Sequence, residues 1–237
     1  MGTLSVLVIG AEPLLQVHRF NEPHELNGGG SWLFCTSTID RLPLEPGAAG
    51  RILQGGRDPW AGDAFVEKTS GFVGQARKDA VDIDAMRDAA GAAAGNEWDR
   101  AEAARGGLPW ETYHEVFTRY PADNSGGERY RAQPAVRAMR EAGLSTERSC
   151  ADWYALPRHE YVDWARASAL VDDYFQIVHD GEPLIGNSED AWMREMYEAP
   201  QPVTEYLARR HAFFARLQAI LDAAPGHTLL TSVLVKV

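Results

Sequence analysis

Two residues on a predicted helix have the types and spacing of metal ligands. His159 and Asp163 lie four residues apart in the sequence His-Glu-x-x-Asp, which places both side chains on one helical face. An imidazole nitrogen and a carboxylate oxygen are common ligands of divalent metals. A complete site needs a third ligand, for which the sequence offers four candidates: Asp172, Asp173, His179 and His114. The simpler alternative is a solvated helix face with Arg158 and Arg166 nearby.

A second group of candidate residues is a cluster of carboxylates where a helix is predicted to begin. Asp82 and Asp84 lie in the first turn, with Asp79 and Asp88 near them. Carboxylates grouped in this way could bind Mg²⁺ or act in acid–base chemistry. The helix dipole also explains them, because negative charge in the first turn faces the positive end of the helix. Both interpretations stay open.

The third candidate is an arginine that follows two glycines. Gly55, Gly56 and Arg57 precede Trp60 in the sequence. Glycine allows the backbone to approach a ligand closely, and a guanidinium can bind a carboxylate or phosphate through two hydrogen bonds. A tight turn with a surface arginine is the alternative. If Arg57 lay in one cleft with Asp82 and Asp84, the three would suit a divalent metal and an anionic small molecule.

The hydrophobic pattern predicts an α+β fold that must position these residues, with strands at both ends and helices between them. The predicted strands are 5–9, 14–20, about 32–36, 174–179 and 228–237. The predicted helices are 83–104, 110–119, 134–142, 158–169, 192–197 and 203–221. We expect the first two strands to form an edge hairpin, with a short parallel excursion as the alternative, and the two terminal strands to pair in one sheet. The closing strand is apolar on both alternating faces, which favours a central place. One domain over 1–237 is expected, with an optional helical insertion over 78–170.

Acidic charge is concentrated in residues 151–200. This segment holds eleven Asp and Glu against three Arg, so it carries −8 of the formal net charge of −11. It also holds eight aromatic residues: Trp153, Tyr154, Tyr161, Trp164, Tyr174, Phe175, Trp192 and Tyr197. Several of these rings lie at helical spacings that suit burial. The segment is therefore predicted to be an exposed acidic face with an aromatic underside.

Composition excludes several classes of function. An excess of acid over base argues against direct binding to the nucleic-acid backbone, which depends on Lys and Arg. The apolar runs 4–9 and 229–237 are shorter than the roughly 18 residues of a membrane span, and no secretory signal is visible. The two cysteines, Cys35 and Cys150, form no metal-binding or disulfide pattern. We therefore expect a cytoplasmic protein with no membrane association.

Four islands of sequence resemble a group of uncharacterised proteins encoded by actinobacterial phages and prophages. The islands are the Gly55-Gly56-Arg57 loop, the stretch 76–88 (ARKDAVDIDAMRD), the strand ending at 179–182 and the closing strand 228–237. In the group, an aromatic residue tends to follow the Gly-Gly-Arg loop and also the position of Glu182. This chain instead has Pro59 shortly after the loop and Pro183 after Glu182. The resemblance implies a phage-associated setting and no catalytic residues.

Two classes of function remain. The first is an acidic interaction protein whose 151–200 face docks on a host protein, such as a defence factor or a nucleic-acid-binding protein. The second is a divalent-metal-dependent enzyme that acts on a nucleotide or another anionic small molecule, with Arg57, Asp82 and Asp84 as candidate catalytic residues and His159 and Asp163 as candidate metal ligands. The concentration of acidic charge favours the first.

Overall fold

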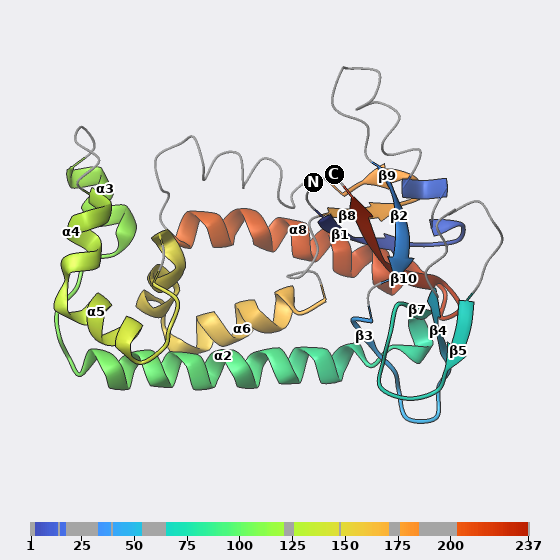
Figure 1. The fold of residues 1–237 in the computed structure, drawn as a ribbon, viewed down its shortest axis with the longest axis horizontal. Helices are drawn as coiled ribbons and strands as arrows, with labels where there is room; N and C mark the ends of the chain where they lie inside the picture. Colours follow the sequence, from blue (N-terminus) through green and yellow to red (C-terminus); the bar gives the residue numbers. More distant parts are fainter. Residues whose placement is uncertain are drawn as a thin grey trace, which may run out of the picture. The chain divides into compact units, whose positions relative to one another are not determined.

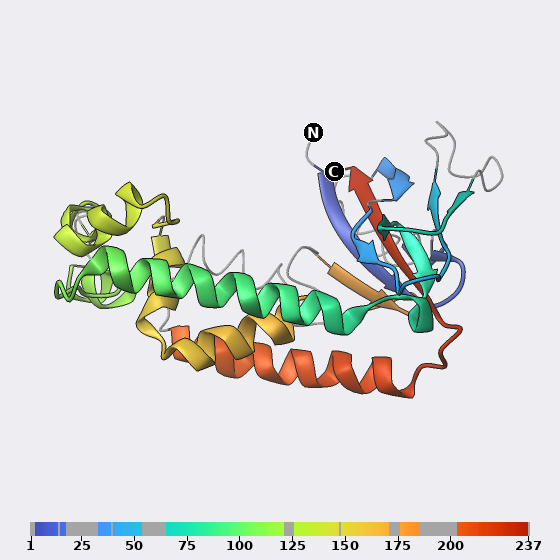
Figure 2. The ribbon, with the colours of Figure 1, turned by 90° about the horizontal axis from the view of Figure 1, so that it is seen from below.

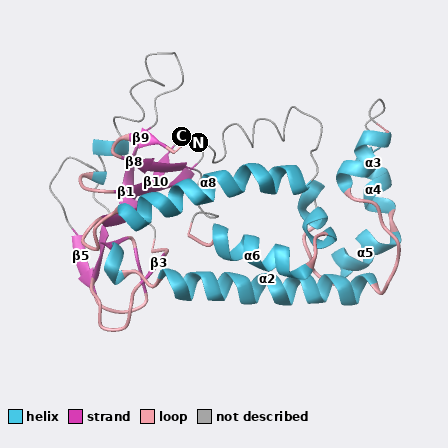
Figure 3. Ribbon diagram, turned by 180° about the vertical axis from the view of Figure 1, so that it is seen from behind, coloured by secondary structure: helices cyan, strands magenta, loops and turns pink. Residues whose placement is uncertain are grey.

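The computed structural model of this chain forms two compact units. It describes residues 3–13, 15–17, 33–38, 40–53, 65–120, 126–146, 148–170, 176–184 and 203–236. Unit 1 comprises Met1–Met86, Leu170–Glu189 and Phe213–Val237, and unit 2 comprises Arg87–Ala169 and Asp190–Ala212. All described strands belong to unit 1, whereas the described regular structure of unit 2 is helical (Figure 3). The expectation of one domain with a helical insertion over 78–170 stays a prediction.

Unit 1 is built on a sheet that contains both terminal strands, and the fold is α+β as predicted (Figure 1). The strands run in the order β5-β4-β7-β10-β1-β8-β9, and β2 also pairs with β10. Their bounds are β1 Thr3–Ile9, β2 Leu33–Thr38, β4 Gly50–Leu53, β5 Phe65–Lys68, β7 Gln75–Arg77, β8 Gln176–His179, β9 Glu182–Pro183 and β10 Leu229–Lys236. Two further strands, β3 (Leu42–Pro43) and β6 (Phe72–Val73), form a separate two-stranded sheet.

The last strand lies in the middle of the sheet. β10 pairs antiparallel with β1, where Val6 is opposite Val233, and on its other side with β7 and β2. The side chains from Leu230 to Val233 are all buried, so both faces of β10 are covered. This burial is the reason for its apolar pattern on both alternating faces. The predictions of a central closing strand and of paired terminal strands are confirmed.

The predicted hairpin between 5–9 and 14–20 is wrong. After β1 the chain passes through Gly10 at φ +119°, and residues 13 and 15–17 are helical. Pro13 suits the start of a helix because its φ is already close to the helical value and its missing N–H has no helical partner there. β1 instead pairs with β8 in parallel and with β10, both distant in the sequence. The alternation of apolar residues over 14–20 did not distinguish a short helix from a strand.

The end of a long helix covers part of the core of unit 1. Helix α8 (Val203–Ala223) buries four apolar side chains in this part: Phe213, Phe214, Leu217 and Leu221. Lys78, in the short 3₁₀ helix η1 (Lys78–Ala80), donates from Nζ to the carbonyl oxygens of Leu221 and Ala224, each at 2.6 Å. These bonds satisfy carbonyl groups that lack a partner at a helix C-terminus. The sequence predicts this helix over 203–221.

Unit 2 gathers helices around an aromatic core. Its elements are α2 (Ile83–Arg105, with its first residues in unit 1), α3 (Tyr113–Arg119), α4 (Gly126–Ala132), α5 (Pro134–Glu141), the 3₁₀ helix η2 (Arg148–Ala155) and α6 (Arg158–Ser168). Its largest fully buried side chains are Tyr130, Val136 and Met139. Figure 2 shows α6 beside α2, in yellow and green.

Helix ends follow the local signals that the sequence contains. Asp82 accepts the Ala85 N–H at 2.8 Å and so caps α2. Pro134 is the first residue of α5, and Gly143 follows that helix at φ +75°. The predicted helix 110–119 begins three residues late, because Thr112 forms a capping box with Glu115.

Within the described residues, no helix is both long enough and apolar enough to cross a membrane. The predicted helix 192–197 and the rings of Tyr174, Phe175, Trp192 and Tyr197 lie outside the described residues.

Candidate functional site

The candidate carboxylates at the start of α2 are engaged in separate local interactions. Asp82 caps the helix through its Oδ1. Asp79 accepts two hydrogen bonds from Arg77, and Asp88 forms an ion pair with Arg166 at 3.5 Å. Asp84 is exposed on the first turn. Among the described residues, Asp82 therefore caps the helix, and Asp79 and Asp88 pair with arginines. Arg57 lies outside the described residues.

The candidate metal ligands lie on α6. His159 and Asp163 are both exposed. Of the proposed third ligands, His179 belongs to unit 1, where its Nε2 lies 3.6 Å from an oxygen of Asp180, and Asp172 and Asp173 are outside the described residues. Among the residues that the structure describes, no three His, Cys, Asp or Glu side chains group closely enough to hold a metal ion. A metal at His159 and Asp163 stays a prediction.

The two arginines of α6 are directed to acids of α2. Arg158 donates from Nε and Nη2 to the two carboxylate oxygens of Asp99, at 2.8 and 2.9 Å. Arg166 pairs with Asp88. The hydrogen bond from Arg158 lowers the pKa of Asp99 and raises that of Arg158. Since the residue numbers run in opposite senses along the two helices, α6 is antiparallel to α2 at this contact.

Two glycines of α2 make room for these arginines. A Cβ at Gly91 would lie 2.7 Å from Nε and 2.9 Å from Cγ of Arg166. A Cβ at Gly95 would lie 2.8 Å from Nη2 of Arg158. All three distances are closer than normal van der Waals contact. The arginine side chains thus lie against the α2 backbone, in space that a larger residue would occupy.

Two exposed acids of α6 have no described basic partner. Glu160 and Asp163 are exposed, and no ion pair to either is formed within the described part of the chain. The buried side of the helix consists of Tyr161, Ala165 and Ser168. We call three of its exposed residues, His159, Glu160 and Asp163, the outer face of α6. This face is one part of the predicted acidic segment 151–200, whose other described acids are Asp152, which is buried, and Asp180 and Glu182, which belong to unit 1.

Aromatic rings support α6 from its buried side. The rings of Trp153 and Trp164 have centroids 4.2 Å apart, and Tyr154 meets Tyr161 edge-on at 5.9 Å. At such distances the rings pack on one another. Tyr154 and Tyr161 are buried, and the two tryptophans are partly buried. The predicted aromatic underside is therefore confirmed for these four rings.

A carboxylate of α2 joins this aromatic cluster. Glu97 accepts the hydroxyl of Tyr154 at 2.7 Å through Oε1 and that of Tyr161 at 3.0 Å through Oε2. Trp98, beside it, donates from Nε1 to the Leu156 carbonyl at 3.0 Å. Sequence reasoning did not identify Glu97, because nothing in the spacing of the α2 acids separates it from Asp99. The tyrosines that select it lie more than fifty residues away in the chain.

A second buried carboxylate holds the start of α3. Asp152, only 2% exposed, accepts the backbone N–H of Tyr113 at 2.6 Å and that of His114 at 3.3 Å. Thr112 accepts the next N–H, from Glu115. Burial raises the pKa of Asp152 to about 6, against the opposing effect of these hydrogen bonds. Asp152 thus satisfies helix N–H groups that otherwise lack partners.

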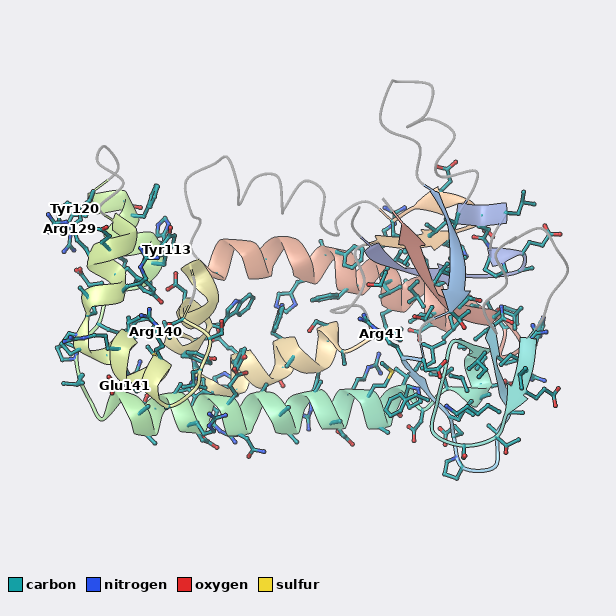
Figure 4. The ribbon with its side chains drawn as sticks, viewed as in Figure 1. Arg41, Tyr113, Tyr120, Arg129, Arg140 and Glu141 are labelled. Carbon is teal, nitrogen blue, oxygen red and sulfur yellow. The ribbon has the colours of Figure 1, made fainter. Side chains whose placement is uncertain are left out.

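The arginines of α4 and α5 have different surroundings from those of α6. The guanidinium of Arg129 lies over the ring of Tyr120, 4.2 Å from its centroid (Figure 4). Arg140 donates from Nε to the hydroxyl of Thr146 at 3.1 Å. A cation above an aromatic face is a stabilising arrangement at the surface.

In unit 1, a buried glutamine joins the carboxyl ends of two parallel strands. Gln16 donates from Nε2 to the carbonyl of Ala11 at 2.6 Å and accepts the N–H of Gly181 at 3.1 Å. Ala11 follows β1, and Gly181 is in the turn after β8. The ends of neighbouring parallel strands are a common place for ligands, but here the amide is occupied by the backbone. Gln16 is another residue that sequence reasoning did not identify.

No family model, curated protein or solved structure matches this chain.

Proposed function

We propose that this protein is an acidic interaction protein that docks on a basic surface of another protein through the outer face of α6, as part of the acidic segment 151–200. One observation carries the proposal. Both arginines of α6 pair with acids of α2, while Glu160 and Asp163 stay exposed without a described basic partner. The two acids of the outer face are therefore available to a basic partner, whereas the two arginines are already paired with α2.

The packing beneath α6 supports a docking role. Tyr161 and Trp164 fill the buried side of the helix and pack on Trp153. The hydrogen bond from Tyr161 to Glu97 adds a polar anchor to α2. A surface held in this way loses little conformational freedom when a partner binds, which favours association.

The chemistry of the partner follows from the sign of the charge. Exposed carboxylates attract Arg and Lys, and the net charge of −11 extends that attraction. Proteins that bind nucleic acids present such basic surfaces. The resemblance to phage and prophage proteins would make the partner a host protein encountered in the cytoplasm. Such association would be sensitive to salt, because exposed charges are screened within about 8 Å at physiological ionic strength.

Binding of a basic peptide tests this proposal. Fluorescence anisotropy with a labelled decapeptide of alternating Arg and Gly would be measured at roughly 20 and 150 mM salt. We expect salt-sensitive binding that the double substitution Glu160→Gln and Asp163→Asn weakens by roughly two- to twentyfold at low salt.

The matched control removes the same charges elsewhere. Glu128→Gln and Asp222→Asn change one exposed Glu and one exposed Asp outside α6. If this control weakens peptide binding as much as the α6 variant does, net charge alone governs the interaction and α6 is not the docking surface. Absence of binding by the wild-type protein at low salt would also refute the proposal.

A further inference from the structure

One arginine of α6 could offset charge on the outer face, yet the structure directs it elsewhere. The outer face contains two acids, Glu160 and Asp163. Arg166 lies three residues after Asp163, a spacing at which its free side chain would reach that acid, whereas Arg158 is not three or four residues from either acid. The placement of Arg166 against α2 therefore decides whether Asp163 has a basic neighbour.

We infer that two residues of α2 position Arg166 and so set the charge of the outer face. Asp88 supplies the counter-charge, and Gly91 supplies the space in which the arginine side chain lies. We call these two residues the arginine clamp. They are positioning residues, because they act on a partner only through Arg166. This inference rests on the proposed function and adds to it the residues that regulate the docking charge.

The geometry at Gly91 is the stronger part of the argument. A methyl group there would lie 2.9 Å from Cγ of Arg166, close to the main chain of α6, as well as 2.7 Å from Nε. Because Cγ has little freedom to move, the whole arginine side chain would have to leave its present position. At Gly95 the nearest atom is Nη2 of Arg158, which lies at the flexible end of the side chain. An alanine at 91 should therefore release its arginine more completely than an alanine at 95.

A double-substitution cycle tests the clamp. Its first substitution, Gly91→Ala, leaves the charge of the protein unchanged. Peptide binding would be measured at low salt for wild type, Gly91→Ala, Arg166→Gln and the two combined. We expect Gly91→Ala to weaken binding by about 1.4- to 5-fold, the range for one exposed charge pair. Arg166→Gln should change binding little in the wild-type background but restore it in the Gly91→Ala background. Effects that simply add would overturn the inference.

A control variant, a folding check and a replacement cycle complete this test. Ala93→Leu adds volume at an exposed position of α2 and should leave binding unchanged. Circular dichroism would establish that each variant is folded at the assay temperature. If Gly91→Ala is unfolded, the same cycle with Asp88→Asn and Arg166→Gln replaces it, and additive effects there would equally overturn the clamp.

The outcomes separate this inference from the proposed function. If the wild type binds the peptide and the Glu160 and Asp163 variant weakens binding, the docking face stands whatever the cycle shows. Additive effects in the cycle would then remove only the clamp. If that variant binds as the wild type does, the docking face is refuted, and the clamp is refuted with it.

Discussion

Arg158 of α6 donates two hydrogen bonds to the carboxylate of Asp99 on α2, across 59 residues of sequence. Both side chains are about half exposed, at 51% and 52%. A pair as exposed as this contributes little to stability, because water screens both charges. Its larger consequence is the position of the arginine charge, which is fixed against the carboxylate of Asp99 on α2.

We predict that Glu97→Leu destabilises unit 2 by about 2–3 kcal/mol. The substitution removes a charged acceptor from two tyrosine hydroxyls, those of Tyr154 and Tyr161, and hydrogen bonds to charged groups are among the stronger ones. Urea unfolding followed by tryptophan fluorescence would measure the change, since Trp153 and Trp164 lie in the same cluster. Glu102→Leu is the control, because Glu102 pairs with Arg105 at the helix surface. An equal loss in both variants would contradict the role of Glu97.

We predict that the buried carboxyl of Asp152 makes the protein less stable as pH rises from about 4 to about 6. Its pKa is about 6 in the folded protein, whereas an unperturbed aspartate has a pKa near 4. Between these values the folded state binds more protons than the unfolded state, so the free energy of unfolding decreases with increasing pH. A difference of two pKa units corresponds to about 3 kcal/mol.

The variant Asp152→Asn isolates this effect from all other titrating groups. Unfolding in urea would be measured for both proteins from pH 4 to pH 7. The stability of the wild type minus that of the variant should be greatest near pH 4 and fall until pH exceeds about 6. A difference that stays constant across this interval would show that Asp152 titrates with an ordinary pKa.

We predict that Gln16→Leu loosens the junction between β1 and β8 in unit 1. The substitution leaves the carbonyl of Ala11 and the N–H of Gly181 without the partner they have now, at a cost of about 1–3 kcal/mol. Hydrogen–deuterium exchange should become faster in peptides that cover β1 and β8. Gln218→Leu, on the surface of α8, should leave these rates unchanged. Unchanged exchange in Gln16→Leu would mean that the junction does not depend on the glutamine.

Several helices could be predicted because their signals are local. Asp82 precedes α2 as its cap, and Pro134 and Gly143 bracket α5. These residues act through bonds and dihedral angles within one or two turns, so nearby sequence is sufficient to detect them. The short strands from β3 to β7 were not predicted, because each has only two to four residues and lies in a stretch rich in Gly and Pro. Their pairing with distant strands is what makes them regular.

The features of the candidate site also divide into those that local sequence predicts and those that it does not. The acidic outer face and the burial of Tyr161 follow from helical spacing, which the chain order alone specifies. The partners of Arg158, Arg166 and Glu97 do not, since several acids of α2 were equivalent in the sequence.

The amino-acid order by itself therefore determined the charge of this protein, the extent of its main helices and the side of α6 that is buried. These properties depend on composition and on the fixed geometry of a helical turn. Tertiary structure decided which acids of α2 neutralise the arginines of α6, that Asp152 would cap α3, and that Gln16 would join β1 to β8. Hydrogen bonds act over about 3 Å, so such choices arise only when folding brings segments far apart in the chain into contact.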